Sequence, residues 1–186
     1  RIAVAGTHGK TTTTAMIAKV LEAARMDPSY MIGCDMDYAE GNARLGGGQV
    51  MVTEADESDS SFLCLSPTVE VITNIEADHM ENFGSLETLI STFKKFIDQL
   101  SPDGFIVIDG TDPNNQNLMA VSNQKFITYG LNPKMEYSAD HLKFNHYSSR
   151  FTLFHRGGEM GEVELSVPGW QNILNSLAVF AVGLVF

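Results

Sequence analysis

The sequence opens with RIAVAGTHGKTTTTAM (residues 1–16), in which an apolar run, a glycine-containing turn and a helix-forming stretch follow one another. Residues 1–5 predict a short buried strand, and residues 11–25 carry apolar side chains at helical spacing. A strand that passes through a glycine-rich turn into a helix is the local context of a phosphate-binding loop. This stretch therefore predicts an α/β fold with an anion site at the start of its first helix.

The residue types in the turn suit a nucleotide phosphate. Glycine lets the backbone turn its N–H groups toward an anion, and the helix N-terminus adds the positive end of a dipole. We expect Lys10 to reach the β- and γ-phosphates of ATP and the Thr11 hydroxyl to bind Mg²⁺. Val4 stands where the standard spacing has a glycine, so the loop is a variant, and a glycine-rich turn without a ligand is the alternative. The candidate nucleotide-binding residues here are Gly6, Thr7, His8, Gly9, Lys10, Thr11 and Thr12.

A carboxylate follows the apolar run QVMVT at residues 49–53. Residues 54–59 read EADESD, so Glu54 stands directly at the end of the expected strand. The carboxyl ends of parallel strands border the ligand crevice of an α/β sheet. We therefore expect Glu54 to hold Mg²⁺ together with Thr11, although a solvated acidic turn is the alternative for such a cluster.

A second polar stretch follows the run TVEVIT at residues 68–73. His79 lies there with Glu76 and Asp78 close by in sequence, which suggests a second metal site or a group that orients a carboxylate. Neutral imidazole is an unusual ligand for Mg²⁺, so an ordinary surface histidine is the alternative.

Alternating strand and helix patterns continue to residue 130, which predicts an α/β fold whose mostly parallel sheet has helices on both faces. Over residues 134–168 apolar and polar residues alternate with a period of two, and Arg156-Gly157-Gly158 suits a hairpin turn. We expect a small antiparallel sheet packed beside the main one, and a returning helix over residues 170–186.

Composition excludes several classes of function. The 186 residues carry a net charge of −11 and show no Lys/Arg cluster, so we expect no nucleic acid as partner. Two cysteines, Cys34 and Cys64, make neither a disulfide framework nor a metal site. No apolar run is long enough to cross a bilayer, and the sequence predicts a cytoplasmic protein without a membrane partner.

Five stretches, in this order along the chain, resemble the Mur ligase family, whose members build peptidoglycan precursors. The run GTHGKTTTT together with EADESD and ADHM is specific, because folylpolyglutamate synthases share only a looser form of the loop and differ afterwards. The matching stretches are AGTHGKTTTTAM (5–16), GNARLGGG (41–48), EADESDSSFL (54–63), TNIEADHMENFGS (73–85) and VPGWQNILNSLAV (167–179).

The resemblance implies a P-loop NTPase-like fold and an ATP-dependent amide-bond ligase. In such a reaction ATP phosphorylates the carboxylate of UDP-N-acetylmuramate, and the amine of L-alanine attacks the acyl phosphate. The family pattern gives Lys10, Glu54 and His79 catalytic roles, with one Mg²⁺ on Thr11 and Glu54 and a second on His79. It also lets Asn172 and Asn175, three residues apart on the last helix, contact the adenine of ATP.

Departures from the family pattern matter for the site. Gln171 stands where the family usually has a histidine; its amide can hydrogen-bond, but it lacks the ring stacking and the charge of histidine. Several Mur ligases use a carbamylated lysine near the second metal, but residues 73–85 contain no lysine, in agreement with the alanine-adding branch.

The family also implies neighbouring domains. Residues 1–186 match its central ATP-binding domain, whereas an N-terminal UDP-binding domain and a C-terminal domain complete the enzyme. We expect ligation to be poor without those domains. A murein tripeptide-recycling ligase of the same family and a generic P-loop NTPase are the alternatives, and Val4 counts against the second.

Overall fold

The computed structural model describes residues 1–33, 41–56, 61–77 and 83–185. The strands within these ranges are β1 (Ile2–Ala5), β2 (Ser29–Met31), β3 (Ala43–Arg44), β4 (Met51–Glu54), β5 (Val69–Ile72), β6 (Phe105–Asp109), β7 (Phe126–Gly130), β8 (Tyr137–Phe144), β9 (Ser149–His155) and β10 (Gly158–Leu165). The helices are α1 (Lys10–Ala23), the 3-10 helix η1 (Ser61–Cys64), α3 (Leu86–Ile97), α4 (Pro113–Ala120) and α5 (Trp170–Gly183).

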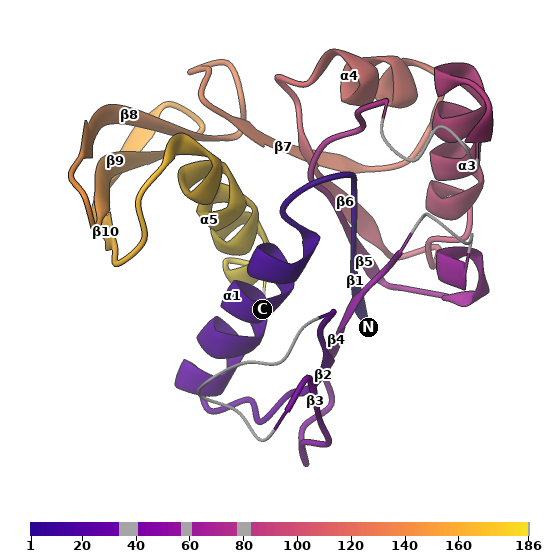
Figure 1. Ribbon diagram of the computed structural model, residues 1–186, viewed down its shortest axis with the longest axis horizontal. Coiled ribbons are helices and arrows are strands. Elements are labelled where there is room, and N and C mark those ends of the chain that lie inside the picture. Colours follow the sequence, from indigo (N-terminus) through magenta and orange to yellow (C-terminus); the bar gives the residue numbers. More distant parts are fainter. Residues whose placement is uncertain (34–40, 57–60, 78–82, 186) are drawn as a thin grey trace.

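A parallel sheet forms the centre of the molecule, with helices on both of its faces (Figure 1). β2, β4, β1, β5, β6 and β7 pair in parallel in that order. Side chains alternate between the faces, as the two-residue period of a strand requires. Val4 and Val71 belong to the core cluster under α1 and α5, whereas Ala3 and Ile106 belong to the cluster under η1, α3 and α4. The three-layer α/β prediction is confirmed.

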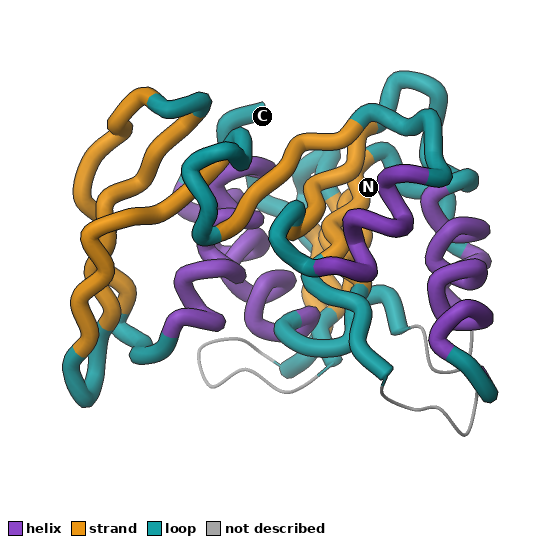
Figure 2. The backbone as a smooth tube through the Cα atoms, turned by 90° about the horizontal axis from the view of Figure 1, so that it is seen from above, coloured by secondary structure: helices purple, strands orange, loops and turns teal. Residues whose placement is uncertain are grey.

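The predicted antiparallel strands are present, and they continue the main sheet instead of packing beside it. β8 pairs in parallel with the end of β7 at Tyr129↔Tyr137 and Gly130↔Ser138, and β9 and β10 follow as antiparallel neighbours. An unpaired edge on β7 would leave backbone N–H and C=O groups exposed, and β8 satisfies part of that edge. α5 contacts β7, β8 and β9, so one helix covers the junction. Figure 2 shows the continuous run of strands from above.

The expected hairpin turn is confirmed at Arg156-Gly157. His155 pairs with Gly158, and the two residues between them have φ values of 51° and 78°. Positive φ at both positions is the geometry of a two-residue turn that matches the twist of the strands.

The carboxyl ends of β1, β4, β5 and β6 lie at one edge of the sheet because these strands are parallel. The segments that follow them therefore meet, and they build the site described below. Across the described part of the chain, no helix has the length and apolar character needed to cross a membrane.

Candidate functional site

The turn between β1 and α1 depends on two glycines. Gly6 has φ 130°, and a Cβ there would lie 2.1 Å from the Thr73 hydroxyl oxygen. Gly9 has φ 86° and is the N-cap of α1, with no side chain capping the helix. By contrast, the hydroxyl of Ser85 and the carboxylate of Asp112 cap α3 and α4.

The first turn of α1 starts without a side-chain cap, which is the geometry that suits an anion. The Thr13 N–H makes the first intrahelical bond, to the Gly9 carbonyl at 2.9 Å. The preceding N–H groups, of residues 9–12, have no carbonyl within the helix to bind, and they carry the positive end of the helix dipole. An anion at this position would accept hydrogen bonds from these N–H groups and would interact favourably with the positive end of the dipole.

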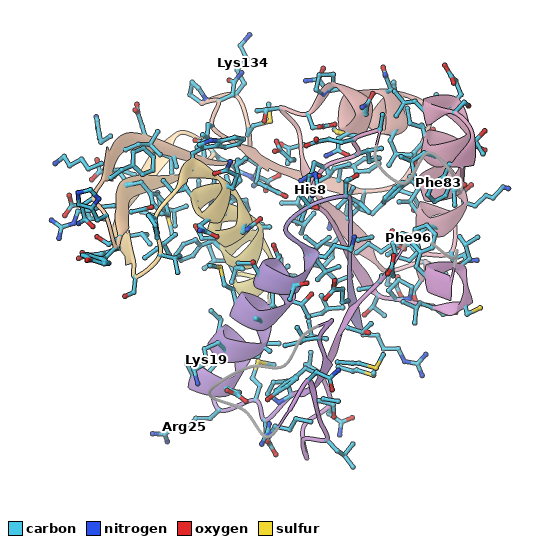
Figure 3. All side chains as sticks on the ribbon, viewed as in Figure 1. His8, Lys19, Arg25, Phe83, Phe96 and Lys134 are labelled. Carbon is cyan, nitrogen blue, oxygen red and sulfur yellow. The ribbon has the colours of Figure 1, made fainter. Side chains whose placement is uncertain are left out.

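Lys10 extends back across the turn, as a phosphate-binding lysine should. Its ammonium donates to the Gly6 carbonyl at 2.7 Å and to the Thr7 carbonyl at 3.4 Å. Figure 3 shows His8 at the tip of the same turn, where its imidazole Nε2 lies 3.8 Å from a Glu76 carboxylate oxygen. The Lys10 ammonium therefore lies over the turn, and the His8 imidazole lies near the Glu76 carboxylate.

Thr11 and Glu54 meet, as the sequence predicted. The Thr11 Oγ1 atom lies 3.0 Å from each carboxylate oxygen of Glu54, and the Gly33 N–H donates to Glu54 Oε2 at 2.7 Å. A hydroxyl and a carboxylate are oxygen ligands of the kind that Mg²⁺ prefers. Within the described ranges no group of three His, Cys, Asp or Glu side chains gathers.

The predicted second metal site lies outside the described residues. This applies to His79 and its neighbour Asp78, and to Glu57 and Asp59 of the acidic stretch.

Asn74, at the end of β5, holds the turn from the side. Its Oδ1 accepts from the His8 N–H at 2.9 Å, its Nδ2 donates to the His8 carbonyl at 3.0 Å, and its backbone carbonyl accepts from the Thr7 N–H at 2.9 Å. The Glu76 N–H adds a bond to the Thr7 hydroxyl at 2.9 Å. Segment 73–76 therefore supports the turn along its length.

A cleft of about 540 Å³ opens beside the turn. It lies between the ends of β5 and β6, the turn before α1 and the start of α5. Its lining residues are His8, Gly9, Thr73, Asn74, Glu76, Asp109, Thr111, Asp112, Tyr129, Trp170, Gln171, Leu174 and Asn175.

The two asparagines of α5 have different environments. Asn175 is buried, lines the cleft and lies so close to Gly9 that a Cβ there would be 2.6 Å from Asn175 Oδ1. Asn172 instead donates to the Pro168 carbonyl at 2.7 Å and does not line the cleft. The carbonyl that precedes the helix attracts the amide of the first turn, so the structure brings Asn175 but not Asn172 to the site. Gln171 lines the cleft where the family usually has a histidine.

Asp109 places a carboxyl in the lining of the cleft, and hydrogen bonds join it to its neighbours. Asp109 Oδ1 accepts from the N–H and the hydroxyl of Thr111, at 2.8 and 2.5 Å. Burial raises the pKa of the Asp109 carboxyl, against these hydrogen bonds, which lower it. Asn115 donates to the carbonyls of Thr73 and Asp109, at 3.2 and 3.0 Å, and so joins the ends of β5 and β6.

Sequence reasoning missed Gly33, Asn74, Asp109 and Asn115. Asn74 and Asp109 each follow or end a buried apolar run, the signal that identified Glu54, and it could have identified them as well. Gly33 and Asn115 contact the site only through the tertiary fold.

Fold and site together define an α/β domain of the phosphate-loop class, with an open helix N-terminus and a hydroxyl–carboxylate pair beside it. The chain belongs to the Mur ligase family, since the family model of the Mur ligase middle domain matches residues 4–183.

Named relatives agree with this assignment. The UDP-N-acetylmuramate–L-alanine ligases of Trichlorobacter lovleyi and Geobacter sulfurreducens are each 44% identical to the chain over 184 residues, which are 98% of the chain and 40% of each relative. The chain thus spans about 40% of the length of these curated relatives.

Solved structures show the same fold. The UDP-N-acetylmuramate–alanine ligase of Thermotoga maritima superposes with a TM-score of 0.84 at 36% identity, over 99% of the chain and 41% of that protein. The UDP-N-acetylmuramate:L-alanyl-gamma-D-glutamyl-meso-diaminopimelate ligase of Neisseria meningitides has a TM-score of 0.88 at 28% identity, over 98% of the chain and 60% of that protein.

Proposed function

We propose that this chain is the ATP-binding core of an ATP-dependent ligase that phosphorylates the carboxylate of UDP-N-acetylmuramate for attack by L-alanine. The observation that carries the proposal is the Thr11–Glu54 contact beside the open N-terminus of α1. The names of the relatives at 44% identity support the choice of substrates.

The roles of the residues follow from their positions. N–H groups of residues 9–12 and the Lys10 ammonium would bind the ATP phosphates and stabilise the charge of the transferring phosphoryl group. Thr11 and Glu54 would hold Mg²⁺, which supplies further neutralisation of phosphate charge when it is bound. His79 would assist at a second metal. The adenosine would occupy the cleft beside Asn175.

The chemistry has two steps. A carboxylate oxygen of UDP-N-acetylmuramate attacks the γ-phosphorus, and the bond to the β-phosphate oxygen breaks as ADP leaves. The amine of L-alanine then attacks the acyl phosphate carbon, loses a proton, and inorganic phosphate leaves. Lys10 and the helix N-terminus serve the first step, because they lie where the phosphates would bind.

Other domains would bring the remaining groups. We propose that an N-terminal domain binds the UDP moiety and a C-terminal domain completes the ATP and amino-acid sites, as the family implies. We also propose a cytoplasmic location, without nucleic acid or membrane as partner.

The tripeptide-adding ligase is the second candidate. Its Neisseria relative gives the higher TM-score, 0.88 against 0.84, although at lower identity, 28% against 36%. The names of both ligases contain UDP-N-acetylmuramate, so the candidates differ in the amine that attacks. Sequence identity favours L-alanine.

Calorimetric titration of the chain with a non-hydrolysable ATP analogue, with and without Mg²⁺, tests nucleotide binding. We expect binding that requires Mg²⁺ and is lost in Lys10→Ala, while Lys134→Ala, at an exposed lysine away from the cleft, binds like the wild type. If the wild-type chain binds no analogue in Mg²⁺, either alone or within the enzyme that carries the neighbouring domains, the proposal that this chain forms an ATP site is wrong. Product analysis of the enzyme, supplied with L-alanine alone or with the tripeptide alone, shows which amine it joins and so decides between the two candidates.

A further inference from the structure

Asn74 makes the same pair of bonds to His8 that a neighbouring strand would make. Its Oδ1 accepts from the His8 N–H and its Nδ2 donates to the His8 carbonyl, at 2.9 and 3.0 Å. The identity of these two partners determines which way the carboxamide faces, because an N–H must meet the oxygen and a carbonyl must meet the nitrogen.

This pair of bonds between Asn74 and His8, called the clamp below, changes which N–H groups can meet a phosphate. The His8 N–H donates to the Asn74 side chain, and the Thr7 N–H donates to the Asn74 carbonyl at 2.9 Å. These two N–H groups are thus directed to segment 73–76 and away from an anion. Phosphate recognition passes to the first turn of α1, at residues 9–12.

The clamp also determines where α1 begins. His8 directly precedes Gly9, the N-cap of α1, so the position of the His8 peptide determines where the open N–H groups lie. Gly9 in turn lies against the Asn175 amide on α5. Small displacements of groups that bind a reacting phosphate are costly to affinity and rate.

We propose that Asn74 is a positioning residue for nucleotide binding: it holds the His8 peptide so that the first turn of α1 receives the phosphates. This positioning role rests on the proposed function, because it takes the turn to bind a nucleotide. Asn74 acts through the turn and need not touch the nucleotide. Segment 73–76 therefore serves as the fixed support of the phosphate-binding turn.

The test compares three variants of the chain. Asn74→Ala removes both side-chain bonds to His8, and Asn74→Asp keeps the acceptor but loses the donor when it is ionised. Asn114→Ala is the control, because Asn114 holds the same segment through the Ile75 carbonyl, at 2.6 Å, without contacting the turn. Thermal unfolding of each variant reports any general loss of stability.

The first measurement needs no ligand. Amide hydrogen exchange at His8, followed by NMR, should accelerate about tenfold or more in Asn74→Ala and stay near the wild-type rate in Asn114→Ala. Unchanged exchange at His8 in Asn74→Ala would overturn the proposal, whether or not the chain binds nucleotide.

The second measurement is the affinity for the Mg²⁺ complex of the non-hydrolysable ATP analogue. We expect Asn74→Ala to lose about tenfold or more in affinity and Asn114→Ala to keep it. The ratio of the Asn74→Asp affinity to the wild-type affinity should rise as pH falls, because a protonated carboxyl again donates to the His8 carbonyl. The Asn74→Ala ratio should stay flat with pH.

The outcomes separate the two proposals. Accelerated exchange at His8 together with wild-type affinity in Asn74→Ala would overturn the positioning role. A wild-type chain that binds no analogue, either alone or with its neighbouring domains, would overturn the proposed function, and His8 exchange would still decide whether Asn74 holds the turn.

Discussion

Gly33 lies against the Glu54 carboxylate, and only a residue without a side chain leaves room for that contact. A Cβ on Gly33 would lie 2.7 Å from Glu54 Oε2 and 3.0 Å from Oε1. Because Glu54 also contacts the Thr11 hydroxyl, Gly33 affects the proposed metal site without contributing a ligand.

Gly33→Ala should therefore weaken Mg²⁺-dependent nucleotide binding. The added methyl pushes the carboxylate away from Thr11, and we expect a loss of about tenfold in affinity for the Mg²⁺-nucleotide complex, roughly 1.4 kcal/mol. Titration calorimetry at several Mg²⁺ concentrations measures it. Gly183→Ala is the control, since a Cβ there meets its nearest atom at an ordinary 3.6 Å. Equal affinities for the two variants would contradict the argument.

Glu70 is a carboxyl buried in the middle of the central strand β5. The side chain is fully buried, and neither of its oxygens has a hydrogen-bond partner among the described residues. Burial, with a smaller contribution from Asp98, raises the pKa of Glu70 to about 9. The folded protein therefore holds this carboxyl neutral at pH 7, whereas the unfolded chain ionises it.

The pH dependence has a definite sign. A pKa raised in the folded state gives Glu70 its most favourable contribution to stability below about pH 4.5, and that contribution is lost as pH rises toward about 9. Glu70→Leu removes the titration, so the gain in unfolding free energy over the wild type should grow across that range and reach about 1–3 kcal/mol at pH 7. Urea unfolding at a series of pH values measures it, with the exposed Glu159→Gln as control. A gain that is independent of pH would refute the assignment.

At the scale of elements, α1 and α5 pack against each other and start beside the same cleft. Both begin at a glycine without a side-chain cap, Gly9 and Gly169. The close approach of Gly9 to Asn175 joins the two helix starts.

Gly9→Ala should push the starts of α1 and α5 apart. The left-handed φ of 86° costs a side chain about 1–2 kcal/mol, and the contact of 2.6 Å with Asn175 Oδ1 adds to it. Gly157→Ala has a similar φ of 78° with no atom within 4 Å, so it reports the backbone strain alone. We expect Gly9→Ala to lower the free energy of unfolding by about 1–2 kcal/mol more than Gly157→Ala does, and to abolish nucleotide binding. Denaturant unfolding of both variants checks the difference, and equal losses would count against the contact.

At the scale of the whole molecule, the ten-stranded sheet differs in burial from centre to edge. Every residue of β5 is buried and pairs on both sides, with β1 and β6. β3 consists of two exposed residues at one edge and pairs with β2. Local opening should therefore cost much less at β3 than at β5.

Amide hydrogen exchange read by mass spectrometry should show this order. We expect the peptides of β5 and β6 to exchange only on global unfolding, and those of β2 and β3 to exchange orders of magnitude faster. Equal protection of β3 and β5 would mean that the sheet opens as one unit.

Local chemistry accounts for the elements that could be predicted. Mainly apolar stretches of four or five residues became β1, β5 and β6, and the Arg156-Gly157 turn formed because positive φ suits that pair of positions. The first turn of α1 and its Lys10 and Thr11 also follow from local order, since a strand, a glycine turn and a helix are adjacent in sequence. Asn172 does not line the cleft, because spacing on a helix does not decide which acceptor an amide finds.

The α/β class, the glycine turn before α1 and the pairing of Thr11 with Glu54 follow from the sequence alone, because each rests on residues adjacent in the chain or on the common edge of parallel strands. The tertiary fold was needed to show that the antiparallel strands continue the main sheet, and that Asn74, Gly33 and Asn175 close around the turn. Those contacts join segments that are 21 to 166 residues apart, as in Gly33 with Glu54 and Gly9 with Asn175. Folding brings such segments together through burial of the whole sheet, and no local pattern specifies where their side chains meet.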